Sequence, residues 1–352
     1  MLKEIKIQNK SISKDSPPFV IAEAGLNHNG DLEKALEMIS VAKNAGVDSV
    51  KFQTFKAHEI VEDKDLTYSY KSQGKEITES MYEMFKRCEF SKNEWYEIKR
   101  KCDDEGIIFL STPQNQTDLD LLLEIGISAI KVGSDDFVSL PLLKDYASAN
   151  LPLILSCGMS NLSEVFETLD VVGAFKGHPT ILLLTTSQYP TPPEDVNLKK
   201  LQTLSTAFPM IPLGFSDHTI GTIAAANAVT LGAQVFEKHF TLDHGLPGPD
   251  HWFASNPKEL KEYVQTIRQS YIMLGSQIVR PTPTEKEMRT IARRSVTALE
   301  DISEGITFTK ENIGLRRPGD GIEPKYFEKV LGKKSSRKIK KGTSLKFSDL
   351  FE

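Results

Sequence analysis

The stretch GFSDHTIG (214–221), followed by QVFEKHFTLDHGLPGPDH (234–251), decides the fold class of this chain. Two compact apolar runs, residues 212–215 and 234–240, predict strands, and an Ala-rich helical pattern at 221–232 lies between them. Strands that are apolar on both faces and are joined through a helix are typical of parallel sheets. The stretch therefore predicts one strand, helix, strand unit of an α/β fold.

Each of these two strands carries one histidine near its C-terminal end, His218 and His239. Two imidazoles on adjacent parallel strands could share one metal ion, and such a site would leave coordination positions open to water and substrate. The alternative is that one or both histidines are core or loop residues with a structural role. Neighbouring charges, in DH and EKH, favour a functional site.

The same pattern of an apolar run followed by an amphipathic helical stretch recurs eight times along the chain. Eight parallel strands alternating with helices predict an α/β protein with a closed (β/α)₈ TIM barrel, and an open doubly wound sheet is the alternative. The predicted strands are residues 19–24, 49–53, 107–111, 129–132, 152–156, 180–185, 212–215 and 234–240.

A change in composition predicts a second domain after the barrel. The barrel pattern ends with a helix at 257–274, and a Pro-rich spacer follows. We assign residues 1–279 to the barrel, 280–290 to a linker and 291–352 to a small module. About 60 residues are few for a large core, so we expect this module to pack on the barrel or on a second chain. Its predicted strands are 295–299, 306–309 and 313–316.

The connection 58–91 is long and polar and carries Tyr68, Tyr70 and Tyr82. Long connections after barrel strands are commonly lids over a site, so this one is a candidate cover. An insertion without a functional role is the alternative.

The composition bounds the possible partners and the compartment. A net charge of −5 over 352 residues argues against nucleic-acid and membrane binding, which usually need a basic surface. Cys88, Cys102 and Cys157 form no CxxC pair, which suits reduced thiols. No signal-like segment and no run of about 18 apolar residues is present. We expect a soluble, cytoplasmic protein.

Polar residues gather at the predicted C-terminal ends of the strands, where barrel enzymes carry their catalytic groups. Lys51 and Lys131 are flanked by apolar residues, so their charges should lie inside the barrel mouth and need an anion. Hydroxyl groups of nearby strand ends would complete a pocket for a phosphate or a carboxylate, and these are Thr112, Ser134, Ser156 and Ser216.

Two other interpretations of the lysines remain open. They could be paired for structure alone, with Glu23, Asp136 and Glu237 as partners. One of them could instead be a Schiff-base nucleophile, which needs no metal. Glu23 lies in an apolar run, so burial should raise its pKa and suit it to proton transfer, although burial by itself gives no function.

Ten segments together resemble one family over nearly the whole chain: IAEAGLNHNG, VKFQTF, STP, IKVGSDD, LSCGMS, YPTP, GFSDHTIG, FEKHF, PGPDH and RRPGDGI. The chain resembles the sialic acid synthases, also called N-acetylneuraminate or nonulosonate synthases. The resemblance implies a TIM barrel followed by an antifreeze-like SAF domain, which packs over the partner's barrel in a domain-swapped homodimer. It also implies a transferase that condenses phosphoenolpyruvate with an open-chain N-acetylmannosamine-type sugar and releases phosphate.

The resemblance further implies a cofactor and a role for each matching residue. The cofactor is Mn²⁺, or another divalent metal such as Mg²⁺ or Co²⁺, with His218 and His239 as its ligands. Glu23 is the proton-transfer residue, and Arg317 is the partner's contact to the acyl group of the sugar. The other catalytic and substrate-binding residues are Lys51, Lys131, Thr112, Ser134, Ser156 and Ser216 for phosphoenolpyruvate, and Tyr189 and Asp250 for the sugar.

Two substrate-binding positions depart from the family pattern. Asp136, in GSDD, stands where many members have GSGE, so the carboxylate that contacts the sugar is shorter. Ser187 stands where an Asn often meets the phosphate. The product is therefore either N-acetylneuraminate or a relative such as legionaminate. A metal-independent aldolase that uses Lys131, and a non-catalytic carbohydrate-binding protein, are the alternatives to a synthase.

Overall fold

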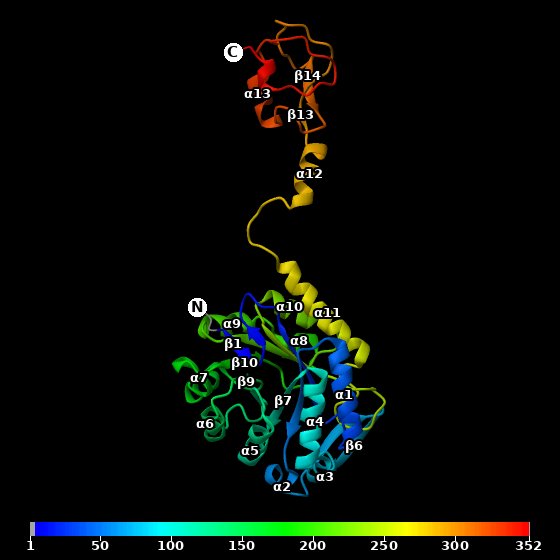
Figure 1. Cartoon of the computed structure of the whole chain (residues 1–352), viewed down its shortest axis with the longest axis vertical. Coiled ribbons are helices and arrows are strands. Elements are labelled where there is room, and N and C mark those ends of the chain that lie inside the picture. The colour runs from blue at the N-terminus through cyan, green and yellow to red at the C-terminus, as the bar shows by residue number, and fades with distance from the viewer. Residues whose placement is uncertain (1–3, 352) are drawn as a thin grey trace. The chain divides into compact units, whose positions relative to one another are not determined.

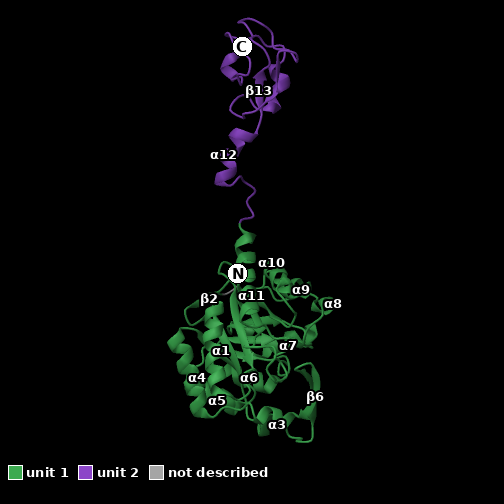
Figure 2. Cartoon of the chain, turned by 90° about the vertical axis from the view of Figure 1, so that its right-hand side faces the viewer, with its two compact units in different colours: residues 1–275 green, residues 276–352 purple. Residues whose placement is uncertain are grey.

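The computed structural model describes residues 4–351. The chain divides into two compact units, Met1–Gly275 and Ser276–Glu352, which Figure 2 colours separately. The division lies slightly before the predicted end of the barrel at residue 279. Residues expected to form a linker, 280–290, are partly helical, because α12 covers Pro283–Ala292.

The first unit is a closed barrel of eight parallel strands, as the sequence predicts (Figure 1). Closure excludes the open doubly wound sheet. Adjacent strands pair in chain order, and the last strand pairs with the first of the barrel. The strands are β3 (Phe19–Gly25), β4 (Ser49–Thr54), β7 (Ile108–Pro113), β8 (Ile130–Val132), β9 (Leu153–Ser156), β10 (Thr180–Leu184), β11 (Leu213–Asp217) and β12 (Val235–His239).

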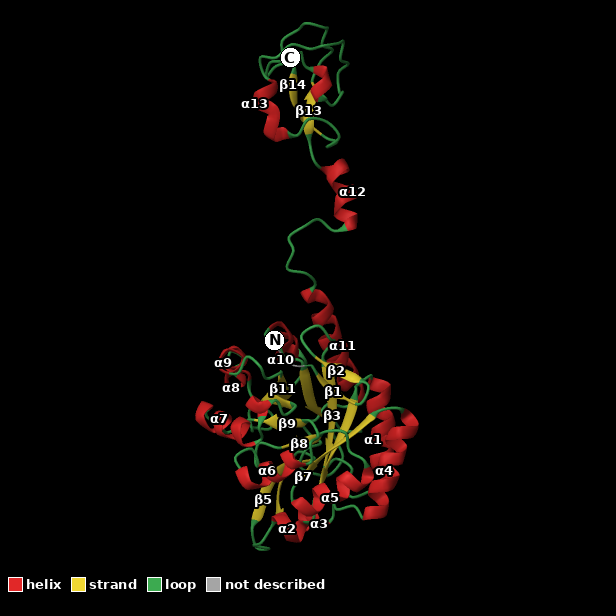
Figure 3. Cartoon of the chain, turned by 60° about the vertical axis from the view of Figure 1, so that its left-hand side comes forward, coloured by secondary structure: helices red, strands yellow, loops and turns green. Residues whose placement is uncertain are grey.

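Helices surround the barrel and bury one face of each against the strands (Figure 3). Local sequence sets their ends: Asp31 caps the first helix by accepting from Lys34 N, and Gly46 ends it at φ 86°. No helix among residues 4–351 is long and apolar enough to cross a membrane. The helices are α1 (Leu32–Ala45), α4 (Lys92–Glu105), α5 (Gln116–Ile125), α6 (Leu140–Ser148), α7 (Leu162–Val171), α8 (Pro193–Val196), α9 (Lys200–Ala207), α10 (Ile223–Thr230) and α11 (Pro257–Leu274).

A short hairpin packs against the N-terminal ends of the barrel strands. It contacts a layer of apolar side chains that the first residues of these strands contribute. Its strands are β1 (Ile5–Ile7) and β2 (Lys10–Ile12), which pair antiparallel. Ile7 and Ile12 are fully buried and belong to the same cluster as Phe19 and other early strand residues. The start of the barrel is therefore packed with apolar side chains, and polar groups are left to the other end.

The predicted insertion is an ordered subdomain of α2 (Ala57–Ile60), β5 (Thr67–Ser72), β6 (Lys75–Ser80) and α3 (Met81–Lys86). Strands β5 and β6 form an antiparallel hairpin. Its turn is tied to the loop after β12, because Gln73 Nε2 donates to Gly245 O at 2.8 Å and Gly248 N donates to Ser72 Oγ at 3.1 Å. The insertion therefore has a fixed place beside a loop at the C-terminal end of the barrel strands.

The second unit has its own buried core, formed by Val296, Phe308, Ile339 and their neighbours. It contains α12, the antiparallel pair β13 (Ser295–Ala298) and β14 (Ile313–Arg316), and α13 (Phe327–Val330). The predicted strand at 306–309 is wrong, because this segment forms only an isolated bridge between Thr307 and Lys334. The segment nevertheless makes backbone hydrogen bonds to residues 332–335, including Phe308 N to Lys333 O at 2.9 Å.

Candidate active site

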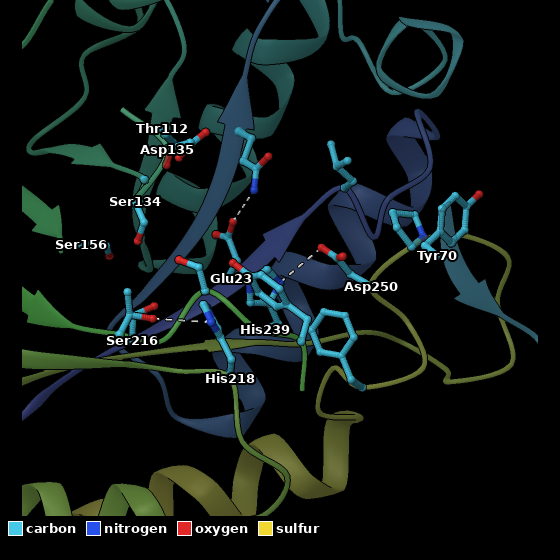
Figure 4. Close-up of a pocket in the computed structure, with 18 of the residues that line it drawn as sticks. Glu23, Tyr70, Thr112, Ser134, Asp135, Ser156, Ser216, His218, His239 and Asp250 are labelled. Carbon is cyan, nitrogen blue, oxygen red and sulfur yellow. Dashed lines mark hydrogen bonds and ion pairs between the residues drawn. The ribbon is translucent and has the colours of Figure 1, made fainter. Parts of the chain in front are cut away.

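A pocket of about 550 Å³ opens at the C-terminal ends of the barrel strands. This volume suits a small organic ligand. Figure 4 shows side chains from several strands converging on it. Of the residues singled out from the sequence, the pocket brings together Glu23, Lys51, Thr112, Lys131, Ser134, Ser156, Ser187, Tyr189, Ser216, His218, His239 and Asp250.

Two lysines and two glutamates form a buried charge cluster on the pocket floor. Lys51 Nζ lies 2.7 Å from Glu23 Oε2 and 3.8 Å from Glu237 Oε2. Lys131 Nζ lies 3.6 Å from Glu237 Oε1 and donates to Ser156 Oγ at 2.8 Å. The cluster is two lysines against two carboxylates, so a carboxylate that becomes protonated leaves a net positive charge for an anionic ligand.

Burial and pairing shift the pKa values of this cluster in different directions. Burial raises the pKa of Glu23 above its ordinary value, and the charge of Lys51 only partly opposes this. For Glu237, burial would raise the pKa, but the charges of Lys131 and Lys51 outweigh burial and lower it. Burial lowers the pKa of Lys131. Glu23 is therefore the carboxyl group of the floor that most readily holds a proton.

The backbone of β3 aims Glu23 into the pocket. The register between β3 and β4 shifts between Glu23 and Gly25, and Gly25 has a left-handed φ of 52°. A Cβ at Gly25 would lie 3.4 Å from Glu23 Oε1, so any larger residue would crowd this carboxylate. Gln53 Nε2 holds the same oxygen at 3.0 Å. The bulge and this hydrogen bond fix the acid on the floor.

One end of the pocket is a cradle of hydroxyl groups around Gly158. A Cβ at Gly158 would lie 2.4 Å from Ser187 Oγ and 2.6 Å from Ser134 Oγ, so only glycine fits there. Ser187 Oγ is buried and makes no hydrogen bond among the described residues. Free hydroxyl groups beside Lys131 are what a phosphate or carboxylate would bind. The substitution of Ser for the Asn of the family pattern therefore still leaves a hydrogen-bonding group in the cradle.

The two histidines lie next to each other with ring centroids 5.4 Å apart. His218 Nδ1 donates to the carbonyl of Thr186 at 2.7 Å, which leaves the Nε2 lone pair free. Burial lowers the pKa of His218 to about 3, so this ring stays neutral. Neutral imidazole with one nitrogen fixed by a carbonyl is the usual form of a metal ligand.

His239 is the other imidazole of this pair. Its Nδ1 lies 3.4 Å from Asp250 Oδ2, too far for a well-formed hydrogen bond, and is unsatisfied among the described residues. No group of three or more His, Cys, Asp or Glu side chains in residues 4–351 could hold a metal. Two neighbouring imidazole rings could still act as the only protein ligands of a divalent ion that keeps its other positions open. Burial would lower the pKa of His239, but Asp250 outweighs burial and raises it, which favours the protonated form in the absence of an ion.

Aromatic side chains flank the histidines. The ring of Tyr189 lies 4.1 Å from that of His218 and 5.6 Å from that of His239. Phe253 lies 5.4 Å from Tyr189 on the same side. These rings form an aromatic side of the pocket next to the two imidazoles.

Two predicted residues are not brought into this pocket. Asp136 is not among the described residues that line it, and its Oδ1 accepts from Ser139 Oγ at 3.2 Å. Asp135 lines the pocket instead, folded over Gly133, where a Cβ would meet Asp135 Oδ1 at 2.1 Å. Arg317 belongs to the second unit. Adjacent aspartates cannot be told apart from sequence, because the turn after β8 decides which one faces inward.

From the sequence, Glu237 was expected only as a structural partner of the lysines, and it does lie near both of them on the pocket floor. Its position two residues before His239 on the same strand implies that it faces the same side. An apolar side of the pocket was not expected. Met81, Met84 and Phe85 line the pocket, but their helical spacing reads as core packing. The local sequence of a helix is the same whether its apolar face packs in the core or lines a pocket.

A closed barrel with a polar pocket at its strand ends is the arrangement of a barrel enzyme, and the relatives named below identify the class as the nonulosonic acid synthases. The chain belongs to the NeuB family, which matches residues 38–279, and residues 293–350 match the SAF domain. The resemblance seen in the sequence is thereby confirmed.

Relatives with assigned activities extend over most of the chain. It is 40% identical over 331 residues to the N,N'-diacetyllegionaminic acid synthase of Legionella pneumophila, covering 93% of each. It is 34% identical over 321 residues to the human N-acetylneuraminate-9-phosphate synthase, covering 90% of this chain and 88% of that one. The crystal structure of N-acetylneuraminic acid synthetase from Leptospira borgpetersenii superposes with a TM-score of 0.73 at 35% identity, covering 82% of this chain and 95% of that one.

Proposed function

We infer that this enzyme condenses phosphoenolpyruvate with the open-chain form of an N-acetylmannosamine-type sugar to give a nonulosonic acid and phosphate. The observation that carries the proposal is the arrangement of the pocket along one line. Figure 4 places Ser134 and Ser156 at one side, Glu23 and His239 at the centre and Asp250 toward the other side. In this arrangement the two serines would belong to an anion site, and Asp250 would belong to a second substrate site. The acid and Lewis-acid chemistry would take place between them, at Glu23 and His239.

Phosphoenolpyruvate is assigned to the hydroxyl cradle and the two lysines. Lys131 Nζ is held by Ser156 Oγ, and Lys51 Nζ donates to Thr112 Oγ1 at 3.2 Å, so both ammonium groups are fixed in direction. One lysine at each end of a small trianion would hold its phosphate and its carboxylate. Glu237 bridges the lysines and limits their mutual repulsion. C3 of the enol is then presented to the centre of the pocket.

His218 and His239 would hold the divalent ion, which, when bound, supplies Lewis-acid polarisation of the sugar aldehyde. The remaining chemistry falls to Glu23. Its raised pKa lets the carboxyl group give a proton to the aldehyde oxygen as C3 attacks and a carbon–carbon bond forms. The resulting carboxylate then takes a proton from the water that adds to C2. Loss of phosphate from C2, with the hydroxyl proton, leaves the 2-keto acid.

The test is phosphate release from phosphoenolpyruvate in the presence of Mn²⁺, with and without chelator. We expect release that needs an N-acetylated sugar aldehyde and stops with chelator. Release that is unaffected by chelator would contradict the metal assignment. Absence of release with every sugar tried would contradict the synthase reaction on this substrate class.

A second activity is favoured by one observation. Burial lowers the pKa of Lys131, and an amine with a lowered pKa is suited to a Schiff base. Lys131 also donates to Val132 O at 2.9 Å and to Ser156 Oγ, which ties up its protons. These hydrogen bonds favour a binding role for the ammonium group over nucleophilic attack.

The functional unit in this proposal is a domain-swapped homodimer in which Arg317 contacts the sugar bound to the partner's barrel. Apolar side chains are exposed where the barrel ends and the second unit begins. Ile272 and Met273 are 74% and 80% exposed, and Val279 is fully exposed. Exposed apolar side chains of this kind, here on each of the two units, are typical of regions that are covered in an assembly.

A further inference from the structure

The loop that follows β12 carries Asp250 to the pocket. Residues 241–254 belong to no helix or strand. Asp250 nevertheless lines the pocket beside His239, whose Nδ1 lies 3.4 Å from Asp250 Oδ2 (Figure 4). A loop without regular structure places a side chain this closely only when other contacts hold its backbone.

The turn after β3 supplies such contacts through Asn29. Asn29 Nδ2 donates to Pro247 O at 2.8 Å and lies 3.2 Å from His251 Nε2. His251 Nδ1 lies 2.7 Å from Thr241 Oγ1, and this hydroxyl donates to Asp243 O at 3.0 Å. We name Asn29, Thr241 and His251 the loop clamp. Its three side chains join the start of the loop, the residues around Asp250 and the turn after β3.

One arrangement of protons satisfies the whole clamp. The amide nitrogen of Asn29 can only donate, and its bond to Pro247 O fixes the direction of the amide, so His251 Nε2 accepts. His251 Nδ1 then carries the ring proton and donates it to Thr241 Oγ1. Burial lowers the pKa of His251 to about 4, which keeps the ring in this neutral form. The chain of bonds runs in one direction, so it favours a single conformation of the loop.

The backbone around the clamp is shaped to admit it. Asn29 has a left-handed φ of 53°, which asparagine tolerates better than most residues. At Gly248, with φ 143°, a Cβ would lie 2.8 Å from His251 Cδ2 and 2.9 Å from Asn29 Oδ1. Thr241 is fully buried and His251 is almost so. None of the three clamp residues is among the described residues that line the pocket, so their contacts serve the loop and not a ligand.

We propose that Asn29, Thr241 and His251 are positioning residues that hold Asp250 beside His239 and so orient this imidazole for a divalent ion. A carboxylate at one ring nitrogen of a histidine fixes the direction in which the other nitrogen points. The distance of 3.4 Å lies just beyond that of a formed hydrogen bond, so a small displacement of the loop is enough to lose the contact. The consequence for the metal ligand rests on the proposed function, whereas the clamp itself does not.

The first experiment changes the hydroxyl of Thr241 and follows hydrogen exchange of the full chain. Thr241→Val keeps the shape but removes the hydroxyl, and Thr241→Ser keeps the hydroxyl. We expect residues 240–256 to exchange about 10-fold faster in Thr241→Val than in wild type, and within about twofold of wild type in Thr241→Ser. Thr168→Val is the matched control, because it removes a buried hydroxyl that donates to Phe137 O at 2.8 Å outside the pocket. Equal exchange of this segment in Thr241→Val and wild type would overturn the clamp.

The second experiment measures Mn²⁺ binding to the same variants without substrates, by electron paramagnetic resonance. We expect the Kd for Mn²⁺ to rise by about 10-fold or more in Thr241→Val and to stay within about twofold in Thr241→Ser and Thr168→Val. Unchanged Mn²⁺ affinity in a folded Thr241→Val whose loop exchanges faster would overturn the positioning role. A wild type that binds no Mn²⁺ would overturn the metal assignment and this proposal with it. Normal Mn²⁺ binding without phosphate release would overturn only the proposed reaction.

A variant of Asn29 decides the matter if Thr241→Val does not fold. Asn29→Gly removes both amide donors and keeps the left-handed backbone accessible. Asn150→Gly is the matched control, because Asn150 is an exposed asparagine with φ 57°. We expect Asn29→Gly to weaken Mn²⁺ binding by about 10-fold or more and Asn150→Gly to leave it unchanged. Mn²⁺ affinity equal to that of wild type in folded Asn29→Gly would overturn the proposal.

Discussion

Asp217 and Lys238 form a buried ion pair between the two strands that carry the histidines. They are register partners in β11 and β12, and Lys238 Nζ lies 3.3 Å from Asp217 Oδ2. Asp217 Oδ1 also accepts from Thr219 N at 2.8 Å, and Lys238 Nζ donates to Thr219 O. Side chains alternate along a strand, so this pair faces away from the barrel interior while His218 and His239 face the pocket. The pair therefore fixes the turn that follows His218.

Breaking this pair should cost stability and metal affinity together. Lys238→Met leaves an unpaired buried carboxylate, so we expect a loss of about 3–5 kcal/mol in the free energy of unfolding. Asp217→Asn with Lys238→Met should recover much of it, because Asn can still accept from Thr219 N. Lys10→Met, in a pair whose lysine is 46% exposed, is the control and should cost less than about 1 kcal/mol. Chemical denaturation and Mn²⁺ binding would measure both effects. Equal Mn²⁺ affinity in folded Lys238→Met would refute the positioning role.

His239→Ala should remove a metal ligand. We expect turnover to fall by at least about 100-fold and Mn²⁺ binding, followed by electron paramagnetic resonance, to weaken strongly. His244→Ala is a matched control, because His244 is exposed and pairs with Glu259 at 3.0 Å. Full activity of His239→Ala in metal-depleted buffer would be incompatible with the assignment.

Lys131→Gln separates anion binding from Schiff-base chemistry. If Lys131 binds phosphoenolpyruvate, the KM for phosphoenolpyruvate should rise by about 10-fold or more in Lys131→Gln, because a charge-assisted contact is lost. Borohydride added to wild type with pyruvate should then leave the protein mass unchanged. A mass increase that Lys131→Gln abolishes would favour the aldolase alternative. A thermal melt checks that the variant is folded.

Arg317→Ala tests the swapped dimer by complementation. By itself, Arg317→Ala should raise KM for the sugar with little change in melting temperature. Mixed with His239→Ala after subunit exchange, it should regain activity, because the intact barrel of one chain then receives Arg317 from the other. If each site used its own Arg317, no mixture would be more active than its components.

A buried histidine predicts loss of stability in mild acid. Burial lowers the pKa of His28 to about 3, and its Nδ1 accepts from Gly30 N at 3.0 Å. The unfolded chain therefore binds the proton first, so stability is full above pH 6.5 and falls as the pH drops toward 3. The loss at pH 5 is about 2 kcal/mol. His28→Asn keeps an acceptor and should reduce the fall in melting temperature between pH 7 and 5. Part of the fall should remain, because burial also lowers the pKa of His218 to about 3 and that of His251 to about 4. If the melting temperatures of variant and wild type fell equally with pH, His28 would not be a cause of the loss of stability in acid.

The sequence by itself determined the α/β class and its eight repeats of strand and helix, because strands that are apolar on both faces need helices to cover them. The closure of the sheet into a barrel, rather than an open doubly wound sheet, was decided by the tertiary structure. The sequence also determined most of the polar pocket, because the strand ends meet at one rim and every second side chain of a strand points into the barrel. The same argument placed Lys51 and Lys131 at one rim, on strands that only β7 separates, although they lie far apart in the chain.

In turns and insertions, which have no helical or strand periodicity, only the tertiary structure decided which side chains share a surface. Asp135 rather than Asp136 faces the pocket because of the turn over Gly133. The insertion came to line the pocket because its hairpin is tied to the loop that follows β12, a contact between segments about 170 residues apart. Side chains such as Met84 satisfy the same helical pattern whether they face a core or a ligand. Whether such a side chain faces a core or a ligand depends on the segments of the same chain that pack beside it. The local sequence does not encode those contacts.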